Sequence, residues 1–331
     1  MTTASVVPPT LADHLGAPLR VGAPDVAGAL AVFPIYGPAP RLEYRSFARG
    51  CALGVTIKEL GGGASVNDLI VVNPTDKPVL LYEGEEVLGA QQNRTFDVSV
   101  LVGAMASASV PVSCVEQGRW DGSRHAEAFR PAPQAAYPSL RRMKNEQAGA
   151  QRAAGGEARA QQGAVWSEVA AKSARLSVDS PTQAMHDVFE RRRGDLRAYE
   201  KAIPLHDGQT GAIVAIAGAV AVLDFVSRPD AFASLHGPLV HGYALDALEA
   251  ETDAPPPPPV DPTPFLSRVL GAPLTHRDGI GLGSELRFRT RGVGGAGLVA
   301  LDELVQFTAF PAQPNAARAA ITRPSRRPRT A

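Results

Sequence analysis

Cysteine is scarce in this 331-residue sequence, which contains only Cys51 and Cys114. Two cysteines are too few for a disulfide framework, and no C-x-x-C pair is present for zinc or redox chemistry. An excess of positive or negative charge is also missing, because the formal net charge is zero. A neutral balance argues against a dedicated nucleic-acid or membrane-surface protein.

Long apolar runs are absent as well. The most apolar stretch, Gly211–Val226, is shorter than the roughly 20 residues that a membrane-spanning helix needs, and it contains Asp224. A buried β-hairpin explains it better. The first twenty residues lack the basic start and the apolar core of a secretory signal. We therefore expect a cytoplasmic protein that has no membrane partner.

The remaining composition is that of a globular chain, with 44% hydrophobic and 20% charged residues. Shifts in composition divide it into five parts. These are a loose N-terminal arm (1–28), a main domain (29–250), a proline-rich linker (251–264), C-terminal strands (265–310) and a basic disordered tail (311–331). The tail has five arginines and no acid, and a disordered, solvated end is the favoured interpretation; we expect no contact with nucleic acid except through this tail.

Within the main domain, we expect the chain to be β-rich to about residue 120 and helical over 121–205. A hairpin and a helix follow over 206–250. Short apolar runs bounded by turn residues predict the strands. They are Ala31–Ile35, Val55–Glu59, Leu69–Asn73, Val79–Glu83, Thr95–Val102, Ser109–Val115, Glu285–Thr290, Leu298–Leu301 and Leu304–Phe310. The pattern predicts an α+β fold: a mainly antiparallel β-sandwich-like unit, packed with mid-chain helices and completed by the C-terminal strands.

Two helices are predicted before the hairpin. The first covers Gln161–Leu176. The second has a capping signature in Ser180-Pro181-Thr182-Gln183. After this signature, apolar residues recur at helical spacing and form a stripe that we assign to the core. The stripe consists of Met185, Val188, Phe189, Leu196 and Tyr199.

Gly292–Gly297 matches the pattern G-x-G-x-x-G literally. That pattern binds a pyrophosphate only where a helix follows it, because the helix N-terminus supplies the anion site. Here an alternating apolar stretch follows, which predicts a strand hairpin. We therefore do not interpret the motif as a dinucleotide fingerprint.

The densest polar segment is GEEVLGAQQNR, which lies between two apolar strands. In an extended chain, Glu83 and Glu85 point to the same side, about 6–7 Å apart. Carboxylates at that separation raise each other's pKa unless a cation intervenes, and Arg94 is the cation that we expect there. Gln92 and Asn93 offer amide donors and acceptors for hydroxyls or a base edge. A ligand site and a hydrogen-bond network that satisfies a strand crossover explain the segment equally well.

A second polar segment, VPVSCVEQGRW, ends at Trp120. Arg119 could grip a phosphate or carboxylate bidentately, and Trp120 could stack on a base or pack as a corner residue. Glu116 is the possible acid or base. Cys114 shares an apolar strand face with Val112 and has no histidine within ten residues, so a buried inert thiol is the better interpretation.

These two segments resemble the signature stretches of the ADP-ribosylglycohydrolase- and rhodanese-phosphatase-associated protein family. Ala164–Trp166 and Ser180–Thr182 also fit, and the resemblance covers about Ala29 to Phe310. Gln91 stands where the resemblance implies a lysine. The family name records bacterial gene neighbourhoods, which implies a link to NAD or ADP-ribose metabolism. The resemblance supplies no catalytic residue.

Two hypotheses follow. The first is a ligand-binding or enzymatic domain that acts on an ADP-ribose-like or nucleotide-sugar molecule. Its candidate catalytic residues are Glu85 and Glu116, and its candidate ligand-binding residues are Gln92, Asn93, Arg94, Arg119 and Trp120. The second is a non-catalytic interaction or scaffold protein in which the same residues are internal struts.

The sequence identifies no cofactor. It contains no cluster of residues typical of a tight zinc site, and we assign no metal site. Glu83, Glu85 and Asp97 are carboxylates that could hold a magnesium ion.

Overall fold

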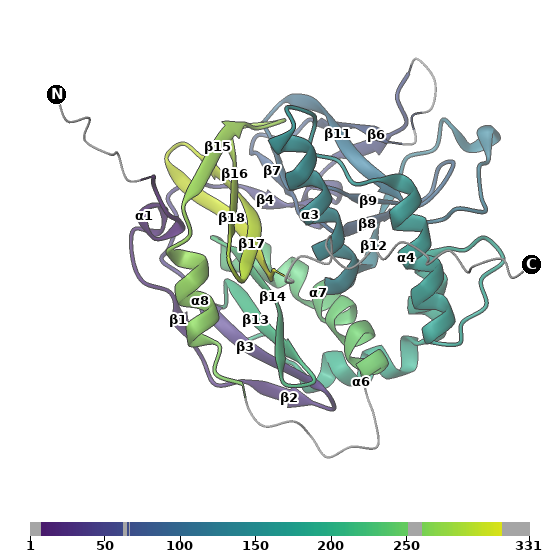
Figure 1. The fold of residues 1–331 in the computed structure, drawn as a ribbon. Helices are drawn as coiled ribbons and strands as arrows, with labels where there is room; N and C mark the ends of the chain where they lie inside the picture. Colours follow the sequence, from purple (N-terminus) through teal and green to yellow (C-terminus); the bar gives the residue numbers. More distant parts are fainter. Residues whose placement is uncertain (1–7, 62–64, 66, 251–259, 313–331) are drawn as a thin grey trace, which may run out of the picture.

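The computed structural model of the protein describes residues 8–61, 65, 67–250 and 260–312. Antiparallel sheets and helices segregate into an α+β fold, as the sequence predicts (Figure 1). Most of the predicted basic tail and of the proline-rich linker lies outside the described residues, although Pro311, assigned to the tail, is the last residue of β18 (Glu303–Pro311). Within the described part, the Gly211–Val226 hairpin and the strands near the C-terminus form as expected.

The largest sheet is antiparallel and unites the two halves of the chain. In spatial order its strands are β1 (Arg20–Val21), β3 (Leu30–Tyr36), β13 (Gly211–Ile216), β14 (Ala219–Val226), β18 (Glu303–Pro311), β17 (Val293–Ala300), β16 (Ser284–Thr290) and β15 (Leu274–Asp278), with β2 (Asp25–Ala27) also paired to β3. Because β14 pairs with β18, the C-terminal strands complete this sheet instead of forming a unit of their own.

Two smaller sheets come from the first half of the chain. The first runs β12 (Arg130–Ala135), β8 (Glu85–Leu88), β9 (Arg94–Phe96), β11 (Ala106–Cys114), β6 (Asp68–Asn73) and β5 (Thr56–Lys58); the second runs β10 (Val100–Val102), β7 (Val79–Leu81) and β4 (Arg45–Ser46). The register pairs Arg94 with both Val87 and Cys114. This register brings the two polar segments side by side.

Proline explains how β11 is paired. The strand pairs with β6 up to Pro111 and with β9 from Val112 onward. Proline has no N–H to give to a ladder, so it is tolerated where a strand changes partner. The predicted strand Thr95–Val102 is divided into β9 and β10, which pair with different strands: β9 with β8 and β11, and β10 with β7.

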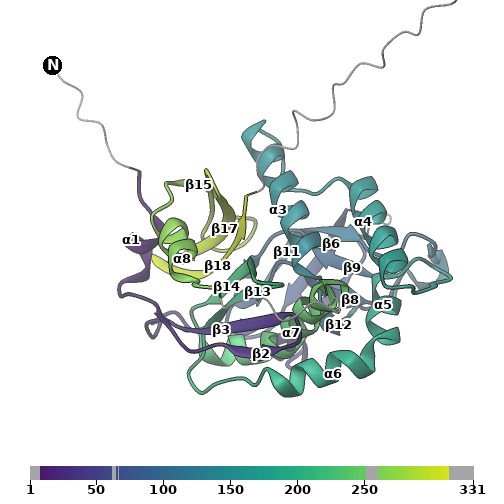
Figure 2. The same cartoon turned by 60° about the horizontal axis from the view of Figure 1, so that its bottom comes forward.

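The helices are mainly in the middle of the chain. They are α1 (Leu11–Leu15), α2 (Phe47–Cys51), α3 (Pro138–Ala153), α4 (Gln162–Arg175), α5 (Met185–Arg191), α6 (Arg193–Ala202), α7 (Pro229–Ala250) and α8 (Thr263–Leu270), with a 3₁₀ turn at Gly122–Arg124. Figure 2 shows α7 over the sheets and α3 beside the C-terminal strands. The capping prediction at Ser180 was wrong in position: Gln183 has a left-handed φ of 53°, so the helix begins only at Met185.

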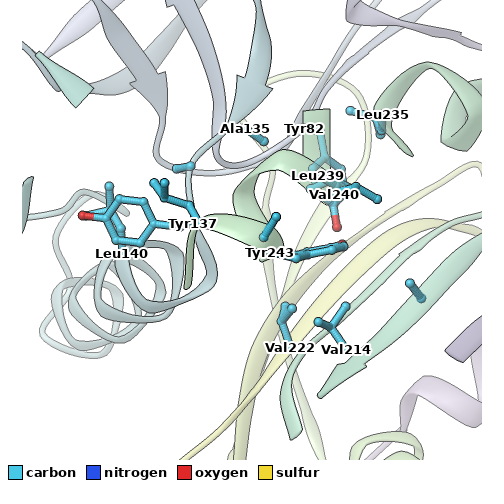
Figure 3. Close-up of a cluster of buried hydrophobic side chains, with 14 of the residues drawn as sticks. Tyr82, Ala135, Tyr137, Leu140, Val214, Val222, Leu235, Leu239, Val240 and Tyr243 are labelled. Atoms are coloured by element: carbon cyan, nitrogen blue, oxygen red, sulfur yellow. The ribbon is translucent and has the colours of Figure 1, made fainter. Parts of the chain in front are cut away.

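The principal core lies between α7, the large sheet and the two smaller sheets (Figure 3). Leu239 and Tyr243 of α7 pack with Val214 and Val222 of the large sheet, and all four are buried. The predicted stripe from Met185 to Tyr199 belongs to this cluster as well, divided between α5 and α6. Each fully buried aliphatic or aromatic side chain contributes roughly 1.5–3 kcal/mol.

A second core covers the other side of the large sheet, and it corrects the prediction of a loose arm over 1–28 for the residues that the structure describes, from 8 onward. Leu11 and Leu15 of α1 are buried against Phe265 of α8 and Phe307 of β18. The expectation rested on the Ala, Pro and Thr content of this segment. It gave too little weight to two leucines four residues apart, which lie on one helix face.

Candidate functional site

The structure brings together six of the seven candidate residues that the sequence singles out: Gln92, Asn93, Arg94, Glu116, Arg119 and Trp120. Glu116 is the centre of the group. Its carboxylate accepts hydrogen bonds from Arg119 Nη2 at 2.6 Å, the Asn93 backbone N–H at 3.1 Å and the Thr182 hydroxyl at 2.9 Å. Gln92 Nε2 donates to the backbone carbonyl of Glu116 at 3.2 Å. The two polar segments therefore share one hydrogen-bonded network.

Arg119 connects this network to the surface. Its guanidinium also donates to the Ala90 carbonyl at 2.7 Å and to Asn93 Oδ1 at 3.1 Å, while its side chain stays 19% exposed. Burial acts to raise the pKa of Glu116, but hydrogen bonds from Arg119 and the Asn93 N–H together hold it below its usual value. Glu116 is therefore a carboxylate at neutral pH.

Arg94 is connected to this network through Gln92 and has no exposed surface. Its Nη1 donates to Gln92 Oε1 at 3.0 Å, and its Nη2 lies 3.8 Å from Glu59 Oε1. The Nε and Nη2 groups of Arg94 and both carboxylate oxygens of Glu59 have no hydrogen bond of normal geometry to any described residue. The indole of Trp120, half exposed, lies 5.8 Å from the Arg94 guanidinium carbon.

We call this group the Arg94–Arg119 cluster; it consists of Glu59, Gln92, Asn93, Arg94, Glu116, Arg119 and Trp120. Buried polar atoms normally have partners, and each exception needs a cause. Here the exceptions are ionisable groups close to the partly exposed Arg119 and the half-exposed Trp120. Burial raises the pKa of Glu59, and the nearby Arg94 only partly opposes that effect.

A second carboxylate adjoins the cluster, and sequence reasoning missed it. Glu86 accepts a hydrogen bond from Gln134 Nε2 at 2.6 Å, and the same amide nitrogen lies 2.7 Å from His186 Nδ1. Burial raises the pKa of Glu86 to about 8, with a further contribution from the charge of Glu116. Glu86 Oε1 has no hydrogen-bond partner among the described residues.

Glu86 and Glu116 are thus two carboxyl groups whose environments push their pKa values apart. At pH 7 the first carries a proton and the second does not. Such a pair can provide a proton donor and a proton acceptor at one site. The signal in the sequence was the run Glu83-Gly84-Glu85-Glu86, but it does not show which glutamate faces the second polar segment.

The expectation for Glu83 and Glu85 was wrong. Gly84 has a left-handed φ of 85°, so the chain turns there and the two side chains diverge. Glu85 accepts a hydrogen bond from the Tyr82 backbone N–H at 2.8 Å, and burial raises its pKa to about 8. Glu83 pairs with Arg141 and not with Arg94.

Arg141 is the centre of a separate buried network that the sequence did not reveal. Its Nη1 donates to Asp224 Oδ2 at 3.0 Å, and its Nε donates to Glu83 Oε1 at 3.0 Å. The hydroxyls of Tyr82 and Tyr243 donate to the same Asp224 carboxylate. An aspartate in an otherwise apolar hairpin was the only available signal, because a buried charge requires a partner.

The suggested magnesium ligands are not assembled either. Asp97 accepts a hydrogen bond from Ser113 at 2.6 Å and pairs with Lys144 at 3.0 Å, while Glu83 and Glu85 face other partners. In the part of the chain that the structure describes, no three His, Cys, Asp or Glu residues are grouped so that they could hold a metal ion. Cys114 is fully buried, and burial raises its pKa, which keeps the thiol protonated.

A cavity of about 650 Å³ lies away from this cluster, between the C-terminal half of α3 and strands β15–β17. None of the residues in the Arg94–Arg119 cluster lines it. The structure therefore presents a polar cluster near the surface and a separate cavity.

The comparisons with known proteins agree with the resemblance of the two polar segments. Residues 18–310 match the model of the ARPP-1 family, described as the ARG and Rhodanese-Phosphatase-superfamily-associated Protein domain. The chain belongs to this family. The ARPP-1 match begins near β1, eleven residues before the expected start at Ala29. The searches of curated proteins and of solved structures found no match.

The ARPP-1 family is thus associated, by its description, with ARG and rhodanese-phosphatase superfamily proteins. Among the residues that the structure describes, no helix is both long enough and apolar enough to cross a membrane.

Proposed function

We propose that this ARPP-1 domain binds a nucleotide-sugar molecule of the ADP-ribose type at the Arg94–Arg119 cluster. One observation carries the proposal: the buried ionisable groups Arg94 and Glu59 keep unused hydrogen-bonding capacity close to a partly exposed arginine, Arg119, and a half-exposed tryptophan, Trp120. Incompletely paired buried charges are costly, and functional sites are where proteins retain them. The association recorded in the family description supports the same class of ligand.

Each part of such a ligand has a chemically suitable partner in the cluster. Arg119 would bind a phosphate, since a guanidinium matches phosphate oxygens bidentately. Trp120 would stack on the base, because its indole is exposed over the buried Arg94. Glu116, ionised at neutral pH, would accept hydrogen bonds from ribose hydroxyls, and Glu86, protonated, would donate one.

Calorimetric titration and thermal denaturation with ADP-ribose test this proposal. At a ligand concentration of about 100 times Kd, binding stabilises the folded state by about 2.7 kcal/mol. We expect Arg119→Ala and Trp120→Ala each to weaken binding by roughly tenfold or more, since each removes one ligand contact. Arg124→Ala is the matched control, because Arg124 lies five residues after Arg119 and forms an ion pair only with Glu127 among the described residues.

A scaffold role is the alternative, and one observation favours it: Glu116, Asn93, Gln92 and Arg119 already hydrogen-bond one another. In that case Arg119→Ala would lower the stability of the protein without affecting any titration. Absence of binding to ADP-ribose, NAD and ADP by the wild-type protein would exclude the proposed ligand class and leave the scaffold role.

A further inference from the structure

The cavity between α3 and the C-terminal strands has a wall made from one polar face of the sheet. On β16, residues two apart lie on the same side, which places Glu285, Arg287 and Arg289 together. Strand β15 adds Arg277, which pairs in register with Glu285. Helix α3 contributes Arg152 from the opposite side. Figures 1 and 2 both show α3 alongside these strands.

Positive charge dominates this cavity. Four arginines line it, and Glu146 is the only acidic residue among the described lining residues. Arg152 and Arg287 share the carboxylate of Glu285, at 2.9 and 2.7 Å. Arg277 and Arg289 are exposed and form no ion pair with any residue that the structure describes. Two guanidinium groups at the cavity are therefore available to an anion.

The glycine-rich stretch of the sequence explains why there is space at this place. Gly294 and Gly295 lie on β17 opposite Arg289 and Phe288, and both glycines line the cavity. Across from them, Gly149 and Ala153 of α3 also line it. A side chain of ordinary size at Gly294 or Gly149 would occupy the space between helix and sheet, whereas a Cβ at Gly295 would meet the Phe288 ring and the Thr308 carbonyl. The glycine-rich stretch therefore lies on a strand, and its lack of side chains leaves space beside that strand. A dinucleotide fingerprint would instead require a turn that leads into a helix.

We propose that this cavity is a second ligand site, which binds a nucleotide through its phosphate groups. Its volume of about 650 Å³ lies within the range typical of small-molecule sites. Arg277 and Arg289 would bind the phosphates bidentately. The accessible apolar lining residues Pro273 and Pro311 would contact the base. The site shares no residue with the Arg94–Arg119 cluster and does not depend on its function.

Titration calorimetry with inorganic pyrophosphate and with ADP tests the site on the full-length protein. The wild type is expected to bind both, and Arg289→Ala to weaken both by roughly tenfold, as expected for the loss of one charge-assisted contact. Arg291→Ala is the matched control: it removes an equal charge from the adjacent turn, and Arg291 does not line the cavity.

A second variant tests the shape of the site without changing its charge. A Cβ at position 294 would meet its nearest atoms at 3.8 and 3.9 Å, which is ordinary contact, so Gly294→Leu should fold. Its side chain would fill the cavity and should abolish ADP binding, while the unfolding temperature should stay close to that of the wild type.

Four results would overturn the proposal, and the first three concern the cavity alone. They are no binding of pyrophosphate or ADP at millimolar concentration, equal weakening by Arg289→Ala and Arg291→Ala, and unchanged ADP binding in a folded Gly294→Leu protein. If Arg119→Ala abolishes ADP binding and Arg289→Ala does not, the nucleotide binds at the Arg94–Arg119 cluster. That outcome would refute the cavity site and support the function proposed for the cluster.

Discussion

The buried ion-pair network around Arg141 permits the sharpest test of how this fold is held together. We consider Arg141→Met, which keeps most of the side-chain volume and removes the charge. In the wild type, Arg141 and Asp224 have no exposed surface, and the guanidinium contacts Asp224 and Glu83 together. Burial acts to raise the pKa of Asp224, yet Arg141 and the two tyrosine hydroxyls hold it below its usual value.

Removing the cation leaves two buried carboxyl groups without their partner. Breaking a buried pair in this way costs about 3–5 kcal/mol, a large fraction of a typical total stability of about 5–15 kcal/mol. Without Arg141, burial would raise the pKa of Asp224 above its unfolded value. The variant would then be most stable at low pH, where the carboxyl is protonated in both states, and would lose stability as the pH rises.

Urea unfolding at pH 5 and pH 8 measures both effects. We expect a larger loss of unfolding free energy at pH 8 than at pH 5. Arg142→Met, at the next position of α3, is the control and should change stability by less than about 0.5 kcal/mol. Adding Glu83→Gln and Asp224→Asn to Arg141→Met should recover part of the loss, because neutral amides carry no buried charge. A loss below about 1 kcal/mol that is equal at both pH values would refute this reasoning.

Further predictions concern the pH dependence of stability and the space around two helical glycines. Burial raises the pKa of Glu86 from 4.5 to about 8, so the folded protein retains a proton that the unfolded chain releases. This group's contribution should therefore lower stability between those pH values, by up to about 1.4 kcal/mol per pH unit, and Glu86→Gln should remove that slope in urea titrations whereas the exposed Glu127→Gln should not. Gly149→Ala should stabilise α3 by about 0.5–1 kcal/mol in thermal unfolding, because the new Cβ would meet its nearest atom at 3.7 Å, an ordinary contact. Gly242→Ala in α7 should instead destabilise, since its Cβ would lie 2.9 Å from the Ala135 carbonyl oxygen; equal effects of the two alanines would contradict this account.

Local patterns in the sequence were sufficient to predict most of the secondary structure. The hairpin at Gly211–Val226, the helix after Pro229 and the core stripe from Met185 all follow from the spacing of apolar residues. The two polar segments were also recognised, because charged side chains beside apolar strands are conspicuous. These features depend on residues a few positions apart, and chain geometry alone relates such residues to one another.

The partners of the charged groups could not be predicted in the same way. Arg141 lies 58 positions from Glu83 and 83 positions from Asp224, and Gln134 lies 48 positions from Glu86. A left-handed turn at Gly84 then determines that Glu86, and not Glu85, adjoins Glu116. The arginine-lined cavity likewise exists only because α3 packs beside the C-terminal strands. Contacts of this kind depend on how elements that are distant in the sequence pack together. The spacing of residues along the chain does not determine that packing.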